Sequence, residues 1–246
     1  MLILDNPKTW PKHIIDQLNQ PSVIKLLTNN NFIDCVLKDS DIKNIFADVE
    51  YYAKDKGIAG YHCAKQLPEK PYKKIGLRIL DFEKHHSEFL DYLKENKLVN
   101  EKQFQIIKTD LAKFKEKNRR ENQLWFCFTR QLVFHDDGCE KFFKYYGGEA
   151  IYMAFVYEEN RTKIKTILEQ IGEPVVVEAH IPIENLTLTK ENPFGNALVS
   201  YFASTINPKF YNDGLEGYVK KNIMPSKITN VYPYETLKIT LKNNKK

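Results

Sequence analysis

Three features are missing from this 246-residue sequence. No apolar run approaches the roughly 18 residues that a transmembrane helix requires, and no charged-then-apolar leader opens the chain. The four cysteines form no C-x-x-C pair, which argues against a structural zinc site, and unpaired cysteines fit a reducing compartment better than a disulfide framework. We therefore expect a soluble, cytoplasmic protein without a membrane partner.

Enough apolar material is present for a packed core. Hydrophobic residues make up 42% of the chain and aromatic residues 13%, which argues against a disordered chain. The length allows one large domain or two small ones. Because no internal repeat and no convincing linker is found, we predict a single domain, 1–246. It would have a helical N-terminal extension over 1–56 and a core over 57–241, with a helical insertion at about 81–120.

The formal net charge of +5 is concentrated in one segment. Residues 65–120 carry 15 Lys/Arg against 9 Asp/Glu, while the rest of the chain is nearly neutral at −1. Such a segment can follow the phosphates of RNA or DNA. A solvated helical face of mixed charge is the commoner use of this composition, and the sequence leaves both interpretations open.

Apolar spacing predicts helices first and strands later. The predicted helices are 10–18, 22–28, 40–56, 81–118, 161–171 and 196–205. The strand candidates are 58–64, 76–80, 124–129, 175–183, 218–223, 228–232 and 236–241. This order predicts an α+β fold built on split antiparallel sheets.

Three short motifs carry residues that are suited to chemistry. Tyr61 and His62 lie on the first strand candidate, the run LWFCFTR forms an aromatic strand, and Glu216 stands between two glycines in DGLEG. Each motif also has an ordinary structural interpretation. A strand histidine is commonly hydrogen-bonded to backbone, an aromatic strand commonly belongs to the core, and an acid among glycines commonly lies in a turn.

The order of these motifs resembles that of the ADP-ribosyltransferase superfamily, which includes poly-ADP-ribose polymerases and bacterial toxins. That family has Y-H on its first core strand, then G-L-R, an aromatic strand ending in Ser or Thr, a helix, and a late glutamate. The matching positions here are Tyr61, His62, Gly76, Leu77, Arg78, Phe126, Phe128, Thr129 and Glu216. The resemblance covers roughly residues 58–232, and the helical insertion departs from the family pattern.

The resemblance implies transfer of ADP-ribose from NAD with release of nicotinamide. Positive charge develops on the ribose in the transition state, so a fixed carboxylate is needed there. Glu216 and His62 are the implied catalytic residues, the acid beside the ribose and the imidazole on the adenosine-side ribose. The implied cofactor-binding residues are Tyr61, His62, Gly76, Arg78, Phe128, Thr129, Tyr145 and Tyr146. No metal is implied.

Three roles in this scheme have more than one candidate residue. Tyr145 and Tyr146 compete to stack on the nicotinamide, and either is also consistent with core packing. Arg78 or Arg130 is expected to meet the pyrophosphate bidentately. The catalytic acid is Glu216 first; Glu149, which also follows two glycines, is ranked second, and Glu178 third.

The acceptor of the ADP-ribose is left open between a nucleic acid and a protein. RNA or DNA would bind through the basic segment 65–120. A toxin or phage-defence role, with an antitoxin partner, is expected only by analogy. Two alternative functions stay open: an RNA 2′-phosphotransferase, disfavoured because it needs clustered arginines, and a non-catalytic module that binds nucleic acid or protein.

Overall fold

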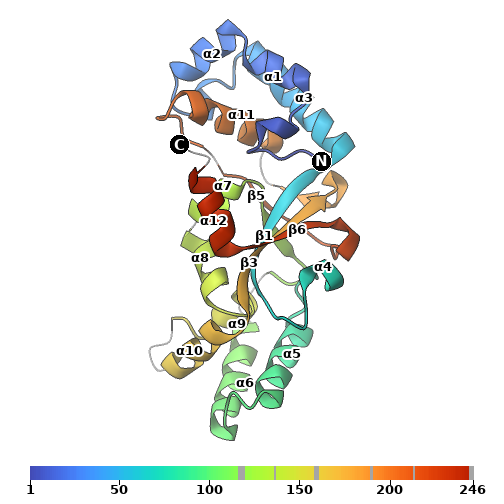
Figure 1. Cartoon of the computed structure of the whole chain (residues 1–246), viewed down its shortest axis with the longest axis vertical. Helices are drawn as coiled ribbons and strands as arrows, with labels where there is room; N and C mark the ends of the chain where they lie inside the picture. The colour runs from blue at the N-terminus through green and yellow to red at the C-terminus, as the bar shows by residue number, and fades with distance from the viewer. Residues whose placement is uncertain (116–119, 136, 158–160, 189–190, 213, 244–246) are drawn as a thin grey trace. The chain divides into compact units, whose positions relative to one another are not determined.

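The computed structural model describes residues 1–115, 120–135, 137–157, 161–188, 191–212 and 214–243 (Figure 1). Over these residues the fold is α+β, as predicted, with twelve α-helices and one six-stranded sheet of order β4-β5-β2-β1-β3-β6. The pairs β1–β2 and β4–β5 are antiparallel. The predicted split sheets are wrong, because alternation along a strand does not specify which other strand it pairs with.

Helices and strands have the following bounds. The helices are α1 Lys12–Leu18, α2 Pro21–Thr28, α3 Ser40–Lys56, α4 Tyr72–Ile75, α5 Phe82–Glu95, α6 Glu101–Lys115, α7 Arg130–His135, α8 Asp137–Lys144, α9 Glu149–Tyr152, α10 Thr162–Gln170, α11 Pro193–Ile206 and α12 Tyr234–Asn243. The strands are β1 Ile58–Gln66, β2 Leu124–Cys127, β3 Glu173–Ile181, β4 Leu186–Thr187, β5 Glu216–Val219 and β6 Ile228–Pro233. Most of the predicted helices and strands are therefore confirmed to within a few residues.

Four of the element predictions need correction. The predicted strand 236–241 lies inside α12, because Leu237 and Leu241, four residues apart, share one helix face. In the predicted strand 76–80, Leu77 makes an isolated bridge to Ile223. Of the predicted strand 218–223, β5 covers only the beginning. The predicted helix 81–118 is interrupted between α5 and α6, and its residues from 116 onward lie outside the described part of the chain.

The described chain divides into two compact units. Unit 1 comprises Met1–Tyr61, Trp125–Val133 and Glu178–Val219, and unit 2 comprises His62–Leu124, Phe134–Val177 and Lys220–Lys246. Strands β1 and β3 contribute residues to both units. In the part of the chain that the structure describes, no helix is both long and apolar enough to cross a membrane.

Unit 1 is built around α3. The side chain of Asp39 accepts hydrogen bonds from the backbone N–H groups of Asp41 and Ile42, which caps the start of this helix. Apolar residues at three- and four-residue spacing form its buried face: Ile42, Ile45, Phe46, Val49 and Ala53. This face packs against α11, which also lies beside α2 (Figure 1).

The contact between α3 and α11 depends on one acid and one glycine. Glu50 of α3 accepts hydrogen bonds from the N–H groups of Phe194 (2.7 Å) and Gly195 (3.0 Å) at the start of α11. Burial raises the pKa of Glu50, and these two hydrogen bonds offset part of the effect. A Cβ on Gly195 would lie 2.7 Å from the Cα of Phe46, so the helices can approach only because residue 195 has no side chain.

Unit 2 has a separate core formed by α5, α6, α9 and α10. Its buried members are Leu67, Phe89, Leu93, Ile107, Leu111, Tyr145, Ile151, Tyr152, Phe155, Ile164, Leu168 and Ile171. The buried ammonium group of Lys65 donates to the carbonyls of Leu168, Glu169 and Lys144, at the C-terminal ends of α10 and α8. A cation is favourable there because the last carbonyls of a helix lack backbone partners.

Candidate functional site

A pocket of about 360 Å³ lies in unit 1, along β5 and beside β2. Its described lining residues are Trp125, Leu132, Thr187, Leu188, Tyr211, Gly214, Leu215, Glu216, Gly217 and Tyr218. The volume is within the range of about 300–1,000 Å³ that is usual for small-molecule sites. Among these lining residues Glu216 has the one acidic side chain, and no Lys, Arg or His is present.

The pocket combines this carboxylate with two aromatic rings. Glu216 begins β5, and Tyr218 follows two residues later, so both side chains lie on the same face of the strand. The ring of Trp125, on the neighbouring strand β2, has its centroid 5.0 Å from that of Tyr218, with 39° between the ring planes. The acid is thus fixed on regular structure next to a paired aromatic surface.

The glycine after the acid provides space. A Cβ on Gly217 would lie 2.5 Å from Cδ2 of Leu188 and 2.9 Å from the carbonyl oxygen of Thr187. Gly217 does not have a positive φ, so its role is not to adopt a left-handed backbone. Gly217 instead lets the chain of β4 close against β5.

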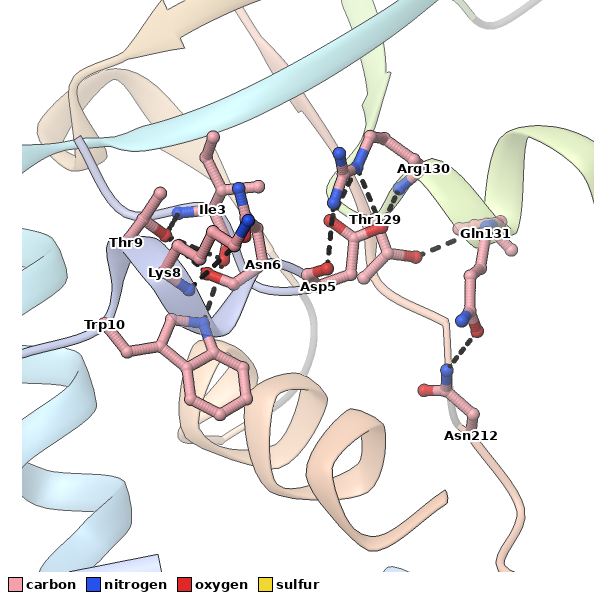
Figure 2. Close-up of polar contacts among 11 residues, drawn as sticks. Ile3, Asp5, Asn6, Lys8, Thr9, Trp10, Thr129, Arg130, Gln131 and Asn212 are labelled. Atoms are coloured by element: carbon pink, nitrogen blue, oxygen red, sulfur yellow. Dashed lines mark hydrogen bonds and ion pairs between the residues drawn. The ribbon is translucent and has the colours of Figure 1, made fainter. Parts of the chain in front are cut away.

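Another part of the pocket wall is formed by Tyr211, Gly214 and Leu215. The side-chain amide of Asn212 donates to Oε1 of Gln131 at 2.8 Å (Figure 2). The N–H of Phe128 donates to the carbonyl of Leu215 at 2.9 Å, and the N–H of Tyr211 donates to the carbonyl of Asn31 at 2.8 Å. These bonds fix the backbone of Tyr211 and Leu215 and the side chain of Asn212.

Directly after β2, Arg130 is held by a buried acid, as Figure 2 shows. The backbone N–H of Arg130 donates to Oδ2 of Asp5 (2.7 Å), Nε donates to Oδ1 (3.1 Å), and Nη2 donates to the Asp5 carbonyl (2.9 Å). Asp5 is 3% exposed, and burial raises its pKa while the Arg130 charge and hydrogen bonds offset part of that rise. The hydroxyl of Thr129, the residue before α7, accepts from the N–H of Leu132 at 3.3 Å and so caps the start of this helix.

Arg78, the other arginine expected to meet a pyrophosphate, is also paired. In unit 2 its Nη1 and Nη2 donate to Oε1 and Oε2 of Glu88, at 2.9 and 2.6 Å. The hydrogen bond with Glu88 raises the pKa of Arg78 and lowers the pKa of Glu88. Either arginine would have to leave or share a carboxylate in order to bind a phosphate.

Four predicted site residues lie in unit 1, and one of them lines the pocket. Glu216 is exposed there. Tyr61 is buried on β1, opposite Cys127 in the β1–β2 register. Phe128 is fully buried, with its ring centroid 6.4 Å from that of Phe194, and the buried Thr129 acts as the helix cap described above.

The other predicted site residues lie in unit 2. His62 is half-buried on β1, and Gly76 ends α4 with a φ of 73°. Tyr145 is buried with its ring centroid 6.1 Å from that of Tyr152. The partly buried Tyr146 stacks on Tyr92, with 6.1 Å between centroids and 26° between planes. Both tyrosines contribute to the core of unit 2, the structural role that the sequence left open for them.

The two alternative acids lie away from the described lining of the pocket. Glu149 begins α9, and its Oε2 is 2.9 Å from Nη1 of Arg120. Burial raises the pKa of Glu149, and the charge of Arg120 opposes the rise. Glu178 is buried on β3. Of the three candidate acids, Glu216 is the one that lines this pocket.

Sequence reasoning missed three aromatic residues of the pocket: Trp125, Tyr211 and Tyr218. Tyr218 was detectable, because it stands two residues from Glu216 and a strand places such residues on one face. Trp125 was visible as an aromatic strand residue, but strand alternation does not distinguish a core ring from one that lines a pocket. Tyr211 has no local signal, since it joins the site only through its loop.

The sequence matches no protein-family model, and neither the curated proteins nor the solved structures include a match to this chain. A functional proposal therefore rests on the pocket of unit 1 and on the sequence motifs.

Proposed function

We propose that the protein is an NAD-dependent ADP-ribosyltransferase that binds the nicotinamide end of NAD in the Glu216 pocket. The observation that supports this most strongly is the pocket's composition. One carboxylate stands beside the rings of Trp125 and Tyr218, with no cationic residue in the described lining. Such a surface favours a flat, positively charged group and disfavours an anion, because ring faces and carboxylates both attract cations. The pyridinium ring of NAD is a flat cation.

The proposed reaction uses the same carboxylate in a second way. The bond between the ribose C1′ and the pyridinium nitrogen breaks, and its electron pair leaves with neutral nicotinamide. Positive charge then develops on the ribose, as in glycoside hydrolysis. Glu216 stabilises that charge where it appears. A hydroxyl or amine of the acceptor forms the new bond to C1′ and loses a proton to solvent.

For the acceptor we propose a nucleic acid. The proposal rests on the basic segment 65–120, which carries 15 Lys/Arg and 9 Asp/Glu. Lys and Arg that contact phosphates release the counterions bound to a nucleic acid, and this release favours binding. Transfer of label from NAD to RNA or DNA should fall steeply between about 50 and 200 mM salt. Labelling that is insensitive to salt would favour a protein acceptor instead.

Turnover of labelled NAD tests the catalytic proposal. Nicotinamide release is measured for the wild type and for Glu216→Gln, with the exposed Glu184→Gln of the same unit as the matched control. We expect the rate to fall about 10²–10³-fold in Glu216→Gln, the usual cost of removing one group that stabilises transition-state charge, and to be unchanged in Glu184→Gln. An unchanged rate in Glu216→Gln would move the acid to Glu149. A wild type that neither binds nor cleaves NAD would favour the binding-module alternative.

A further inference from the structure

Two exposed aromatic rings lie next to each other, and one of them lines the Glu216 pocket. Phe32 is 56% exposed and Tyr211 is 60% exposed. Their ring centroids are 6.3 Å apart, with 37° between the planes. Tyr211 lines the pocket, whereas Phe32 does not belong to its described lining. A single exposed ring needs no explanation, but two adjacent exposed rings that continue the aromatic surface of a pocket form a surface for stacking.

The loops that carry the two rings are fixed to each other. The side-chain amide of the buried Asn207 donates to the carbonyls of Asn30 (2.8 Å) and Thr28 (3.2 Å), just before Phe32. The carbonyl of Asn31 in turn accepts the N–H of Tyr211 at 2.8 Å. Because these loops are ordered before a ligand arrives, stacking on the rings would carry little additional ordering cost.

The size of the pocket places part of a dinucleotide outside it. A volume of about 360 Å³ lies at the low end of the range for pockets that enclose one drug-sized ligand. A dinucleotide has two ring systems joined by two riboses and a pyrophosphate. If the nicotinamide and its ribose occupy the pocket, the second base has to emerge at the rim, where Phe32 and Tyr211 are exposed.

We propose that Phe32 and Tyr211 form a stacking subsite for the adenine base of the dinucleotide. The proposal rests on the proposed function for the location of the nicotinamide end. The charge of unit 1 is compatible with a neutral base: from its sequence the unit carries 10 Lys/Arg and 13 Asp/Glu, a formal charge of −3. Stacking depends on the ring face and not on charge, so this excess of acidic residues does not oppose the binding of a neutral base.

Binding of three compounds, measured by titration calorimetry, tests the subsite. Adenosine carries only the base and its ribose, nicotinamide mononucleotide (NMN) only the other half, and NAD carries both. Phe32→Leu is the decisive variant, because Tyr211 also lines the pocket. We expect adenosine and NAD to bind about 5- to 150-fold more weakly to Phe32→Leu, the usual loss for one stacked base. NMN should bind the variant and the wild type equally.

The matched control is Tyr51→Leu, a tyrosine of the same unit that is exposed on α3; it should leave all three affinities unchanged. Equal loss of NMN and NAD binding in Phe32→Leu would overturn the subsite, as would unchanged NAD binding. Loss of adenosine binding with unchanged NAD binding would mean that the rings take the base of the acceptor, which also contradicts the proposal.

These binding measurements also distinguish a failure of the subsite from a failure of the proposed function. A wild type that binds adenosine in a Phe32-dependent way but does not bind NMN would retain the subsite and refute the nicotinamide pocket. A wild type that binds NMN, with NAD binding unaffected by Phe32→Leu, would retain the pocket and refute the subsite.

Discussion

The two units of the molecule differ in charge, and the concave site lies in the acidic one. Counted from the sequence, unit 1 has a formal charge of −3, while unit 2 carries 27 Lys/Arg and 19 Asp/Glu, a charge of +8. The basic segment 65–120 belongs to unit 2, yet the pocket that contains Glu216 belongs to unit 1. Net charge indicates which partners a surface attracts; it does not indicate where a small-molecule site is built.

The two arginines that were expected to meet a pyrophosphate, one in each unit, differ in the burial of their ion pairs. Arg130 in unit 1 is paired with an acid that is almost completely buried, and its side chain is only 21% exposed. Arg78 in unit 2 makes a bidentate pair, but with much of the guanidinium in solvent. The hydrogen-bond geometry of the Arg78–Glu88 pair is at least as good as that of the Arg130–Asp5 pair. The difference in burial therefore decides which pair contributes more to the free energy of unfolding.

The largest effect on stability is expected for Arg130→Met. The substitution leaves the buried carboxylate of Asp5 without its cation, which costs about 3–5 kcal/mol when a buried pair loses one partner. Chemical denaturation should show this loss in the free energy of unfolding. A loss below about 1 kcal/mol would mean that Asp5 is readily neutralised by a proton. The Arg130–Asp5 pair would then contribute no more to stability than the exposed Arg78–Glu88 pair of unit 2.

A smaller loss is expected for Gly217→Ala in the pocket wall. The new Cβ would lie within 2.5–2.9 Å of Leu188 and Thr187, so β4 has to shift. Overpacking of this kind usually costs about 1–3 kcal/mol. Denaturation measures the loss, and calorimetry with NMN should show weaker binding as well. Unchanged stability together with unchanged NMN affinity would contradict the close packing of β4 on β5.

A still smaller change is expected for Arg78→Met in unit 2. Exposed ion pairs contribute about 0–1 kcal/mol even when their geometry is good, so the free energy of unfolding should change by no more than that. The same denaturation series that measures Arg130→Met supplies this value. A loss as large as that of Arg130→Met would remove the proposed distinction between the two pairs.

The smallest effect concerns the pH dependence of stability in unit 2. The ring Nε2 of His85 lies 2.8 Å from the carbonyl oxygen of Gly147, and burial lowers the pKa of His85, against the opposing effects of that hydrogen bond and of Glu88. The unfolded chain therefore binds the proton more tightly than the folded state. The contribution of neutral His85 to the free energy of unfolding is fully present above about pH 6.5, and it is lost as the pH falls through the lowered pKa of the folded state.

Replacing the imidazole tests this dependence. In His85→Gln the decline of stability below about pH 6.5 should be shallower than in the wild type, whereas substitution of the exposed His13 in unit 1 by Gln should leave the wild-type slope. Parallel slopes for the wild type and His85→Gln between pH 5 and 7 would show that another group carries the acid sensitivity.

Sequence reasoning predicted the local elements well and the long-range arrangement poorly. The helix over 40–56 was found because its apolar residues repeat at 3–4 residues, and the strand over 58–64 because it is a short, aromatic-containing run next to a glycine; both are local signals. The segment 236–241 failed because TLKITL fits both the helix period and the strand period. The single sheet was missed because pairing joins strands that are distant in the sequence, and no local pattern encodes the partner.

The site was predicted in part. Glu216 was selected from its motif, and the structure places it in a pocket, although its catalytic role remains a proposal. The rings expected beside it, Tyr145 and Tyr146, pack in the core of unit 2 instead. Of the aromatic residues that do lie beside the acid, Tyr218 is on β5 itself, whereas Trp125 of β2 and Tyr211 of the loop before β5 are brought to it only by the folded chain.

The central claim is that the pocket of unit 1 selects a flat cation through Glu216. Calorimetric affinities for 1-methylnicotinamide, a cation, and for nicotinamide, its neutral counterpart, test it most directly. We expect the wild type to prefer the cation by roughly 5- to 30-fold, as about 1–2 kcal/mol of charge–ring and charge–charge attraction gives, and Glu216→Gln to lose most of that preference. Equal affinities in the wild type, or a preference that survives in Glu216→Gln, would contradict the claim.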